Sequence, residues 1–148
     1  MNSPVETTIE HAAAALGWIG DPVQVRMCGE TAWAIAAFSA DAHSPAAVAG
    51  VLVAGAPETN PTARASVFAS FCPRAVLVPD GPGVLSVQMD AAVLDQGVVV
   101  VRDDGHVDAL STAGPRVTQP GAGDAGYRRL LEQAHAGLMS PHAGQRVD

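Results

Sequence analysis

Cys28 and Glu30 are the residues of this sequence whose types and spacing best suit catalysis. Apolar residues within 29–38 fall on every side of a helical wheel, which predicts a largely buried helix that begins at Cys28. The unpaired amides of a helix N-terminus stabilise a thiolate and lower the pKa of a thiol placed there. A carboxylate two residues later can shuttle protons beside that sulfur, whether the sulfur is a nucleophile or a metal ligand. The structural alternative makes Cys28 a small buried side chain and Glu30 an acid that complements the helix dipole.

A resemblance to a known enzyme family covers the same segment. Met27-Cys28-Gly29-Glu30-Thr31-Ala32 resembles the Cys-Ala-Glu segment that opens the first active-site helix of the cytidine deaminase family. Residues 60–67 stand where that family has Ser-Pro-Cys-Gly-x-Cys-Arg-Gln, and the similarity spans residues 27–80. The resemblance implies a cytidine deaminase-like fold, in which Cys28 matches a zinc ligand and Glu30 matches the proton shuttle.

The sequence departs from this family at the other two zinc ligands, where Thr62 and Ala65 replace cysteines. A catalytic zinc normally takes three protein ligands, so we expect neither a metal nor another cofactor in this chain. Gly17 and Ile19 stand where the family's Asn-x-Glu binds ribose, so nucleoside recognition is not expected either. We therefore predict a zinc-independent enzyme without hydrolytic cytidine deaminase activity.

The predicted substrate is a small heterocyclic or amide-like metabolite of specialised metabolism, with Glu30 as acid and base and Cys28 as nucleophile or polarising thiolate. Thr31, Thr62 and Arg64 are the predicted substrate-binding residues, because the start of a second helix is expected to converge on the first. Two alternatives stay open at this point. One is a catalytically silent deaminase-like protein that binds a ligand or stabilises a partner, and the other is a metal enzyme completed by ligands from another chain.

Helix and strand patterns alternate along the chain, which indicates an α/β domain whose elements would position these residues. Ser3-Pro4-Val5-Glu6 reads as a capping box that starts a helix over residues 4–16. A second helix is expected between Asn60-Pro61 and Pro73, and a last helix between Asp124 and Leu138. The predicted strands are 23–25, 48–54, 75–78, 84–87, 98–101 and 106–110, with a short helix over 90–94 and a hairpin turn at 103–105. The fold class that follows is α/β, a three-layer α/β/α sandwich with a mixed sheet, resembling the cytidine deaminases.

Composition and net charge limit the expected domain organisation, partners and cellular compartment. The chain has 148 residues, 48% of them hydrophobic, and a net charge of −7, which fits one domain over 1–138 and a flexible tail over 139–148. The negative charge argues against nucleic acid and anionic membranes as partners, and the absence of Lys excludes a Schiff-base lysine. Because the sequence has no run of about 18 apolar residues and no signal peptide, we expect a cytoplasmic protein. Cys28 and Cys72 are expected as free thiols. The resemblance to the cytidine deaminase family implies a homo-oligomer, and the apolar composition is compatible with one.

Overall fold

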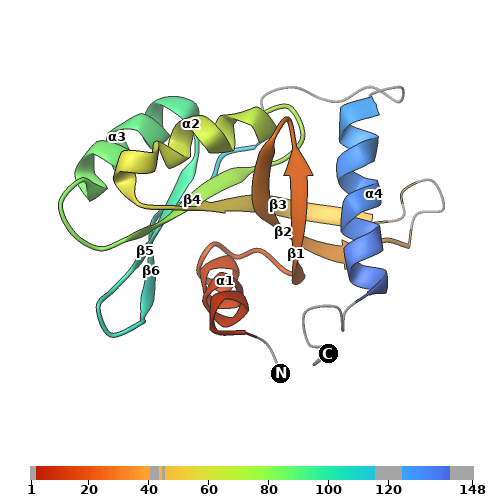
Figure 1. Cartoon of the computed structure of the whole chain (residues 1–148), viewed down its shortest axis with the longest axis horizontal. Helices are drawn as coiled ribbons and strands as arrows, with labels where there is room; N and C mark the ends of the chain where they lie inside the picture. Colours follow the sequence, from red (N-terminus) through yellow and green to blue (C-terminus); the bar gives the residue numbers. More distant parts are fainter. Residues whose placement is uncertain (1–2, 41–43, 45, 116–124, 141–148) are drawn as a thin grey trace.

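The structure is a computed structural model that describes residues 3–40, 44, 46–115 and 125–140. These residues build an α/β fold with one six-stranded mixed sheet and four α-helices, compatible with three α/β/α layers (Figure 1). The helices are α1 (Pro4–Ala15), α2 (Pro61–Ala65), α3 (Val84–Leu94) and α4 (Ala125–Met139), with 3-10 turns η1 (Pro57–Thr59) and η2 (Ser66–Phe68). The strands are β1 (Asp21–Met27), β2 (Glu30–Phe38), β3 (Ala46–Ala54), β4 (Arg74–Pro79), β5 (Gly97–Val101) and β6 (Val107–Ser111).

The strands lie in the sheet in the order of the sequence. β1, β2 and β3 form an antiparallel meander, β3, β4 and β5 run parallel, and β6 returns antiparallel to β5. A parallel pair needs a crossover connection, and here the crossovers are α2, between β3 and β4, and α3, between β4 and β5. Both crossover helices therefore begin just beyond the carboxyl ends of parallel strands.

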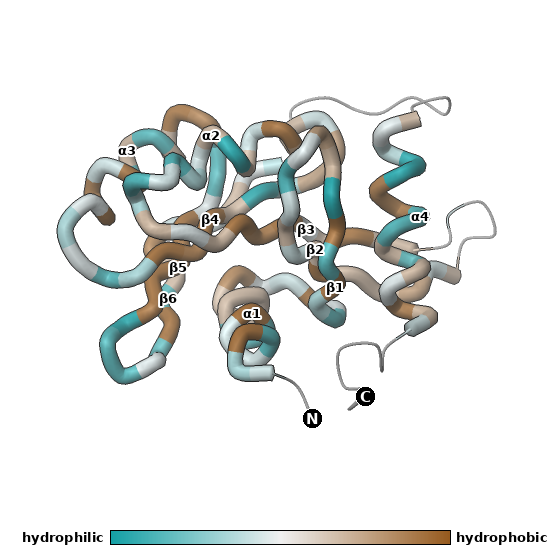
Figure 2. Tube along the Cα trace, viewed as in Figure 1, coloured by the Kyte–Doolittle hydropathy of each residue, from teal (hydrophilic) through white to brown (hydrophobic). Residues whose placement is uncertain are grey.

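Apolar side chains form a packed layer on each face of the sheet. On one face Ile9, Ala12 and Ala13 of α1 pack against strand residues that include Leu52 and Val99. The other three described helices cover the opposite face, and β4 and β5 between the layers are among the most hydrophobic segments (Figure 2). Buried residues of that second layer include Phe68, Val87, Leu130 and Leu138.

The capping box predicted at the start of the first helix is confirmed. The Ser3 hydroxyl accepts a hydrogen bond from the Glu6 amide at 3.1 Å, and the Ser3 amide donates to the Glu6 carboxylate at 3.3 Å. Two of the amides that a helix start leaves unpaired are thus satisfied by local sequence alone.

The predicted helix over 28–38 is wrong, because Glu30–Phe38 forms strand β2. Cys28 and Gly29 are the turn that joins β1 to β2, with φ of 53° and 81° and with Met27 paired to Glu30. Positive φ at both residues of a two-residue loop fits a type I′ hairpin turn. β2 is buried over much of both faces, and periodicity cannot tell such a continuous apolar run from a buried helix. Cys28 therefore does not lie at a helix N-terminus.

The predicted strand over 84–87 is also wrong, because it belongs to the single helix α3, which includes the predicted helix at 90–94. The other predicted helices and strands whose residues are described are confirmed within a few residues, although α2 ends early at Ala65 and continues as η2. The cap at Asp124 and the tail over 141–148 lie outside the described residues. Cys28 and Cys72 are both free thiols. Within the described ranges, no helix has the length and apolar character needed to cross a membrane.

Candidate functional site

A cleft of about 390 Å³ opens where β3 and β4 end and the crossover helices α2 and α3 begin. One wall comes from the segment 57–62 and the other from the segment 82–90. In open α/β sheets, ligands bind outside the carboxyl ends of the parallel strands. The cleft has this position, so we take it as the candidate site.

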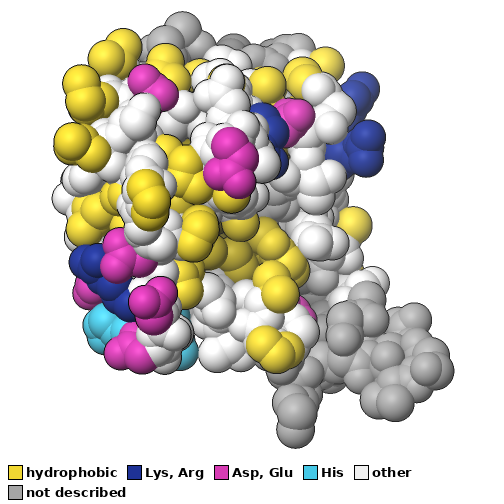
Figure 3. All heavy atoms as spheres, turned by 60° about the vertical axis from the view of Figure 1, so that its left-hand side comes forward, with side chains coloured by type: hydrophobic (Ala, Val, Ile, Leu, Met, Phe, Trp, Pro, Cys, Tyr) yellow, Lys and Arg dark blue, Asp and Glu magenta, His cyan; other side chains and the backbone are white. Residues whose placement is uncertain are grey.

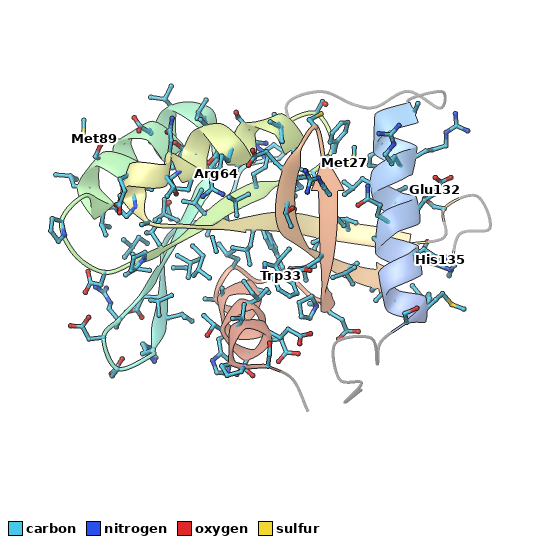
Figure 4. The ribbon with its side chains drawn as sticks, in the orientation of Figure 1. Met27, Trp33, Arg64, Met89, Glu132 and His135 are labelled. Atoms are coloured by element: carbon cyan, nitrogen blue, oxygen red, sulfur yellow. The ribbon has the colours of Figure 1, made fainter. Side chains whose placement is uncertain are left out.

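Arg64 holds the first wall in place. Its Nε donates to the Thr59 carbonyl at 3.2 Å, and its Nη2 donates to the Thr59 hydroxyl at 2.9 Å and to the Ala54 carbonyl at 3.3 Å. Figure 4 shows Arg64 between α2 and the strands. At Gly55 an added Cβ would overlap this guanidinium and the Thr59 hydroxyl, so a larger residue there would displace the Arg64 contacts. Arg64 therefore fixes the loop before α2 through its backbone contacts.

Gly83 brings the second wall against the first. Its φ of 97° is a left-handed value that glycine adopts easily, and an added Cβ would stand 2.9 Å from the Pro57 Cβ. α3 starts directly after this close approach. The two turn segments are thus in close contact at Gly83 and the Pro57 ring, and both segments line the cleft.

Thr62 is the buried polar residue of the cleft, with only 3% of its surface exposed. Its carbonyl accepts a hydrogen bond from Gln96 Nε2 at 2.9 Å, which ties α2 to the residue before β5. Its hydroxyl makes no hydrogen bond to another described residue. Because Thr62 lines the cleft, its hydroxyl is a candidate hydrogen-bonding group for a ligand.

The remaining polar residues of the cleft are the exposed Glu58, Asn60, Ser86 and Asp90. None of these four side chains makes a hydrogen bond or ion pair with another described residue. No basic side chain lies among the described lining residues, so the two carboxylates make the cleft electronegative. Prolines and Val87 supply its apolar surface.

Of the residues predicted to form a site, only Thr62 lines this cleft. Cys28 and Thr31 are exposed and Glu30 is half-buried, all at the β1–β2 turn. The pairing of Trp33 with Leu52 places the start of β2 beside the end of β3, so Glu30 lies toward the same edge of the sheet. The predicted convergence of two helix N-termini does not occur, because no helix begins at Cys28. Catalysis by Cys28 and Glu30 stays a prediction.

A second groove, of about 630 Å³, lies between α1 and the β5–β6 hairpin and is lined by His11 and His106 among others. Much of its polar surface is already paired within the protein. The His106 amide donates to Asp104 at 2.9 Å, and His106 Nε2 lies 3.3 Å from Asp108. Nowhere in the described part of the chain do three His, Cys, Asp or Glu side chains gather as a metal site would require.

Comparison with known proteins found no matching family model, no matching curated protein and no matching solved structure. The site therefore depends on its own geometry. Reasoning from the sequence missed Glu58, Ser86, Asp90 and Gln96. A usable signal was present, because Pro- and Gly-rich turns follow two interior strands directly, and such turns meet at one edge of a parallel sheet.

Proposed function

We propose that this chain is a binding protein for a small organic cation, an ammonium or guanidinium group on a compact apolar body. The observation that carries the proposal is the polar lining of the cleft, in which the described residues include two carboxylates without an ion-pair partner, the Thr62 residue with its hydroxyl, and no basic residue. Carboxylates and hydroxyls accept hydrogen bonds, and the ammonium and guanidinium groups are donors with a positive charge. The net charge of −7 favours approach of a cation over a wider range.

Glu58 and Asp90 supply the charge in this proposal, one from each wall of the cleft. The Thr62 hydroxyl accepts one further hydrogen bond from the ligand in this proposal. Pro57, Pro82 and Val87 contact the apolar body, whose burial adds to the binding free energy. The volume of about 390 Å³ lies in the range of small-molecule sites.

This proposal corresponds to the non-catalytic alternative left open by the sequence. Its support is the lining of the cleft, where Glu58 and Asp90 supply negative charge from the two walls. A zinc-independent reaction at Cys28 and Glu30 and a relationship to the cytidine deaminases are separate predictions. Loss of turnover in Glu30→Ala at unchanged melting temperature would support them.

Three probes of one shape and different charge test the proposal by NMR titration of the full chain. Benzylammonium should shift the backbone amide signals of residues 57–62 and 82–90, and benzyl alcohol should bind several-fold more weakly. Benzoate should not bind, because both carboxylates repel it. Equal affinity for the alcohol and the amine, or shifts elsewhere only, would overturn the proposal.

Variants of the polar lining give a second readout. Removing one carboxylate, by Glu58→Gln or Asp90→Asn, should weaken benzylammonium binding roughly 2- to 5-fold, as expected for a partly exposed ion pair. Thr62→Val removes the hydroxyl at constant shape and should weaken binding roughly 2- to 10-fold. Asp103→Asn, on the β5–β6 turn, removes the same charge outside the cleft and is the matched control. Its affinity should stay close to that of the original chain.

A further inference from the structure

The carboxamide of Gln133, on α4, pairs with the backbone of β1. In the sheet order β1 comes first, so within the described part of the chain β2 is the one strand that borders it. The Arg26 amide donates to Gln133 Oε1 at 2.7 Å, and Gln133 Nε2 donates to the Arg26 carbonyl at 2.8 Å. Two residues of an antiparallel pair exchange their amide and carbonyl bonds in the same way. Gln133 therefore occupies the position of a further strand on the open edge of β1.

These two bonds fix the orientation of the carboxamide. If it were turned over, Oε1 would face the Arg26 carbonyl and Nε2 would face the Arg26 amide, and neither pair could form a hydrogen bond. Nε2 also lies 3.5 Å from Met27 Sδ, which is a weak acceptor. Both polar atoms of the Gln133 side chain are thus engaged with β1.

Gly137 allows α4 to come close enough to β1 for this contact. Gln133 and Gly137 are four residues apart, so they lie on the same side of α4. An added Cβ at Gly137 would overlap the Val23 side chain of β1. A glycine inside a helix lowers helix stability relative to alanine, so its use here favours the close approach. Figure 1 shows α4 beside β1, at the end of the sheet away from β6.

A proline closes another position of the same edge. The Arg26 amide and carbonyl point away from β2. Because the pairing of β1 with β2 has no shift in register, the backbone groups of Gln24 and Pro22 point the same way. Pro22 has no N–H and cannot donate to another strand. The outward groups of Gln24 have no hydrogen-bond partner among the described residues. Natural sheets use edge prolines and covering segments to prevent further strands from adding, and β1 has both.

We propose that Gln133 is an autoinhibitory contact that closes the β1 edge to strand addition, and that the excluded strand is β1 of a second copy of this chain. An antiparallel pairing of two copies about Val25 sets Arg26 opposite Gln24 of the partner subunit, and the reverse pair is equivalent. Each pair exchanges its amide and carbonyl bonds, and Pro22 takes no part. Gln133 prevents this pairing, because its carboxamide already holds both backbone groups of Arg26.

The charges along β1 favour a second copy as the excluded strand. In the register about Val25, each Arg26 faces a neutral Gln24, so no like charges stand directly opposite each other. Asp21, the other charged residue of β1, lies beyond Pro22 and outside the paired segment. The net charge of −7 on each copy opposes association at long range, but at about 0.15 M salt this repulsion is screened beyond about 8 Å.

Sedimentation velocity of the full chain at about 0.15 M salt tests the proposal. Gln133→Ala leaves the amide and carbonyl of Arg26 without these partners, and we expect this variant to associate at roughly tenfold lower concentration than the original chain. Glu132→Ala makes a similar truncation one residue away, at an exposed position, and is the matched control. It should sediment as the original chain does, although it also lowers the negative charge. Association of Gln133→Ala no stronger than that of the control would overturn the proposal.

A proline variant tests whether the association uses the β1 edge. In the Gln133→Ala background, Gln24→Pro removes an outward N–H without breaking a bond to β2, and edge strands tolerate proline at such positions. With an unchanged circular dichroism spectrum, the added proline should return association to the level of the original chain, because the pair between Gln24 and Arg26 then lacks a donor. If the folded double variant associates as strongly as Gln133→Ala, another surface is responsible and the proposal is wrong.

Hydrogen exchange of the original chain gives a readout that needs no variant. The Arg26 amide, bound to Gln133, should exchange roughly tenfold more slowly than the Gln24 amide, which faces solvent from the same strand. In monomeric Gln133→Ala the rate at Arg26 should approach the rate at Gln24. Equal rates at the two amides in the original chain would show that Gln133 does not hold the edge, and would overturn the proposal.

Discussion

Cys28 shows how a single position can carry two opposite interpretations. As the first residue of a helix its thiol would be activated, but as the first residue of a hairpin turn it is an exposed side chain with φ of 53°. In this left-handed region a residue with a Cβ is destabilised by steric contacts. Asn is destabilised less, because its side-chain amide forms local hydrogen bonds. The backbone at Cys28 therefore suits a turn residue better than cysteine.

Cys28→Asn should raise the free energy of unfolding by about 0.5 kcal/mol, because Asn-Gly is the preferred pair of a type I′ turn. Urea denaturation followed by tryptophan fluorescence measures this change. Cys28→Val should lower stability, since a β-branched side chain tolerates positive φ poorly. A less stable Cys28→Asn would show that the thiol contributes contacts that the turn geometry does not explain.

At the scale of elements, the β5–β6 hairpin is held by an ionic cluster. Arg102 donates through Nη1 to Asp80 at 3.0 Å and through Nε to Asp108 at 2.8 Å. These hydrogen bonds hold the pKa of Asp108 below its usual range and raise the pKa of Arg102. In Figure 3, charged side chains and a histidine side chain lie close together at the lower left, on the side of this hairpin. The cluster ties the end of β4 to both strands of the hairpin.

The lowered pKa of Asp108 gives a pH dependence of known sign. A carboxyl group with a lower pKa in the folded chain stabilises the fold above its unfolded pKa, and the stabilisation is lost as the pH falls through the folded pKa. A carbon-detected NMR titration should place the Asp108 midpoint below the model-peptide value of about 3.9. Arg102→Gln should return the midpoint toward that value, because the hydrogen bond from Arg102 is the largest cause of the shift. An unchanged midpoint would contradict this assignment.

At the scale of the whole molecule, Arg74 joins segments that are distant in sequence. It is 1% exposed at the start of β4, and its Nη2 donates to the Leu94 carbonyl at the end of α3 at 2.6 Å. Its Nη1 makes longer contacts with the carbonyls of Cys72, at 3.5 Å, and Pro115, at 3.4 Å. Burial lowers its pKa, and the Coulombic attraction of Cys72 and Asp95 opposes this effect. A buried guanidinium here takes the place of apolar packing.

Arg74→Ala should lower the free energy of unfolding by about 3 kcal/mol or more, since it leaves a cavity and removes charge-assisted hydrogen bonds. Arg74→Met fills most of the same volume without a charge, so it should cost about 1–2 kcal/mol less. Urea denaturation of both variants measures the order. If Arg74→Met were as unstable as Arg74→Ala, the hydrogen bonds rather than the volume would account for the stabilisation.

Local sequence was enough to predict the helix start at Ser3, the parallel-strand segments and the α/β class. In each case the signal is short in range: a capping box, or an apolar run bounded by turn residues. The same reasoning failed for residues 28–38, because burial of β2 on both faces removes the periodicity that distinguishes helix from strand. It failed for residues 84–87 because a short apolar segment fits either a strand or a helix turn. Gly29, in the turn just before β2, was the available clue.

The sequence by itself determined that this chain folds as a mixed α/β protein with negative charge and free thiols. Tertiary structure alone decided which polar residues share a cleft, because Glu58 and Asp90 are 32 positions apart and line the same cleft only when β3 and β4 align in parallel. It also decided which side of α3 stays exposed, since apolar residues on both sides of a helix do not specify its buried face. Residues close in sequence thus determine the helices and strands, whereas pairing between strands determines which residues form the cleft.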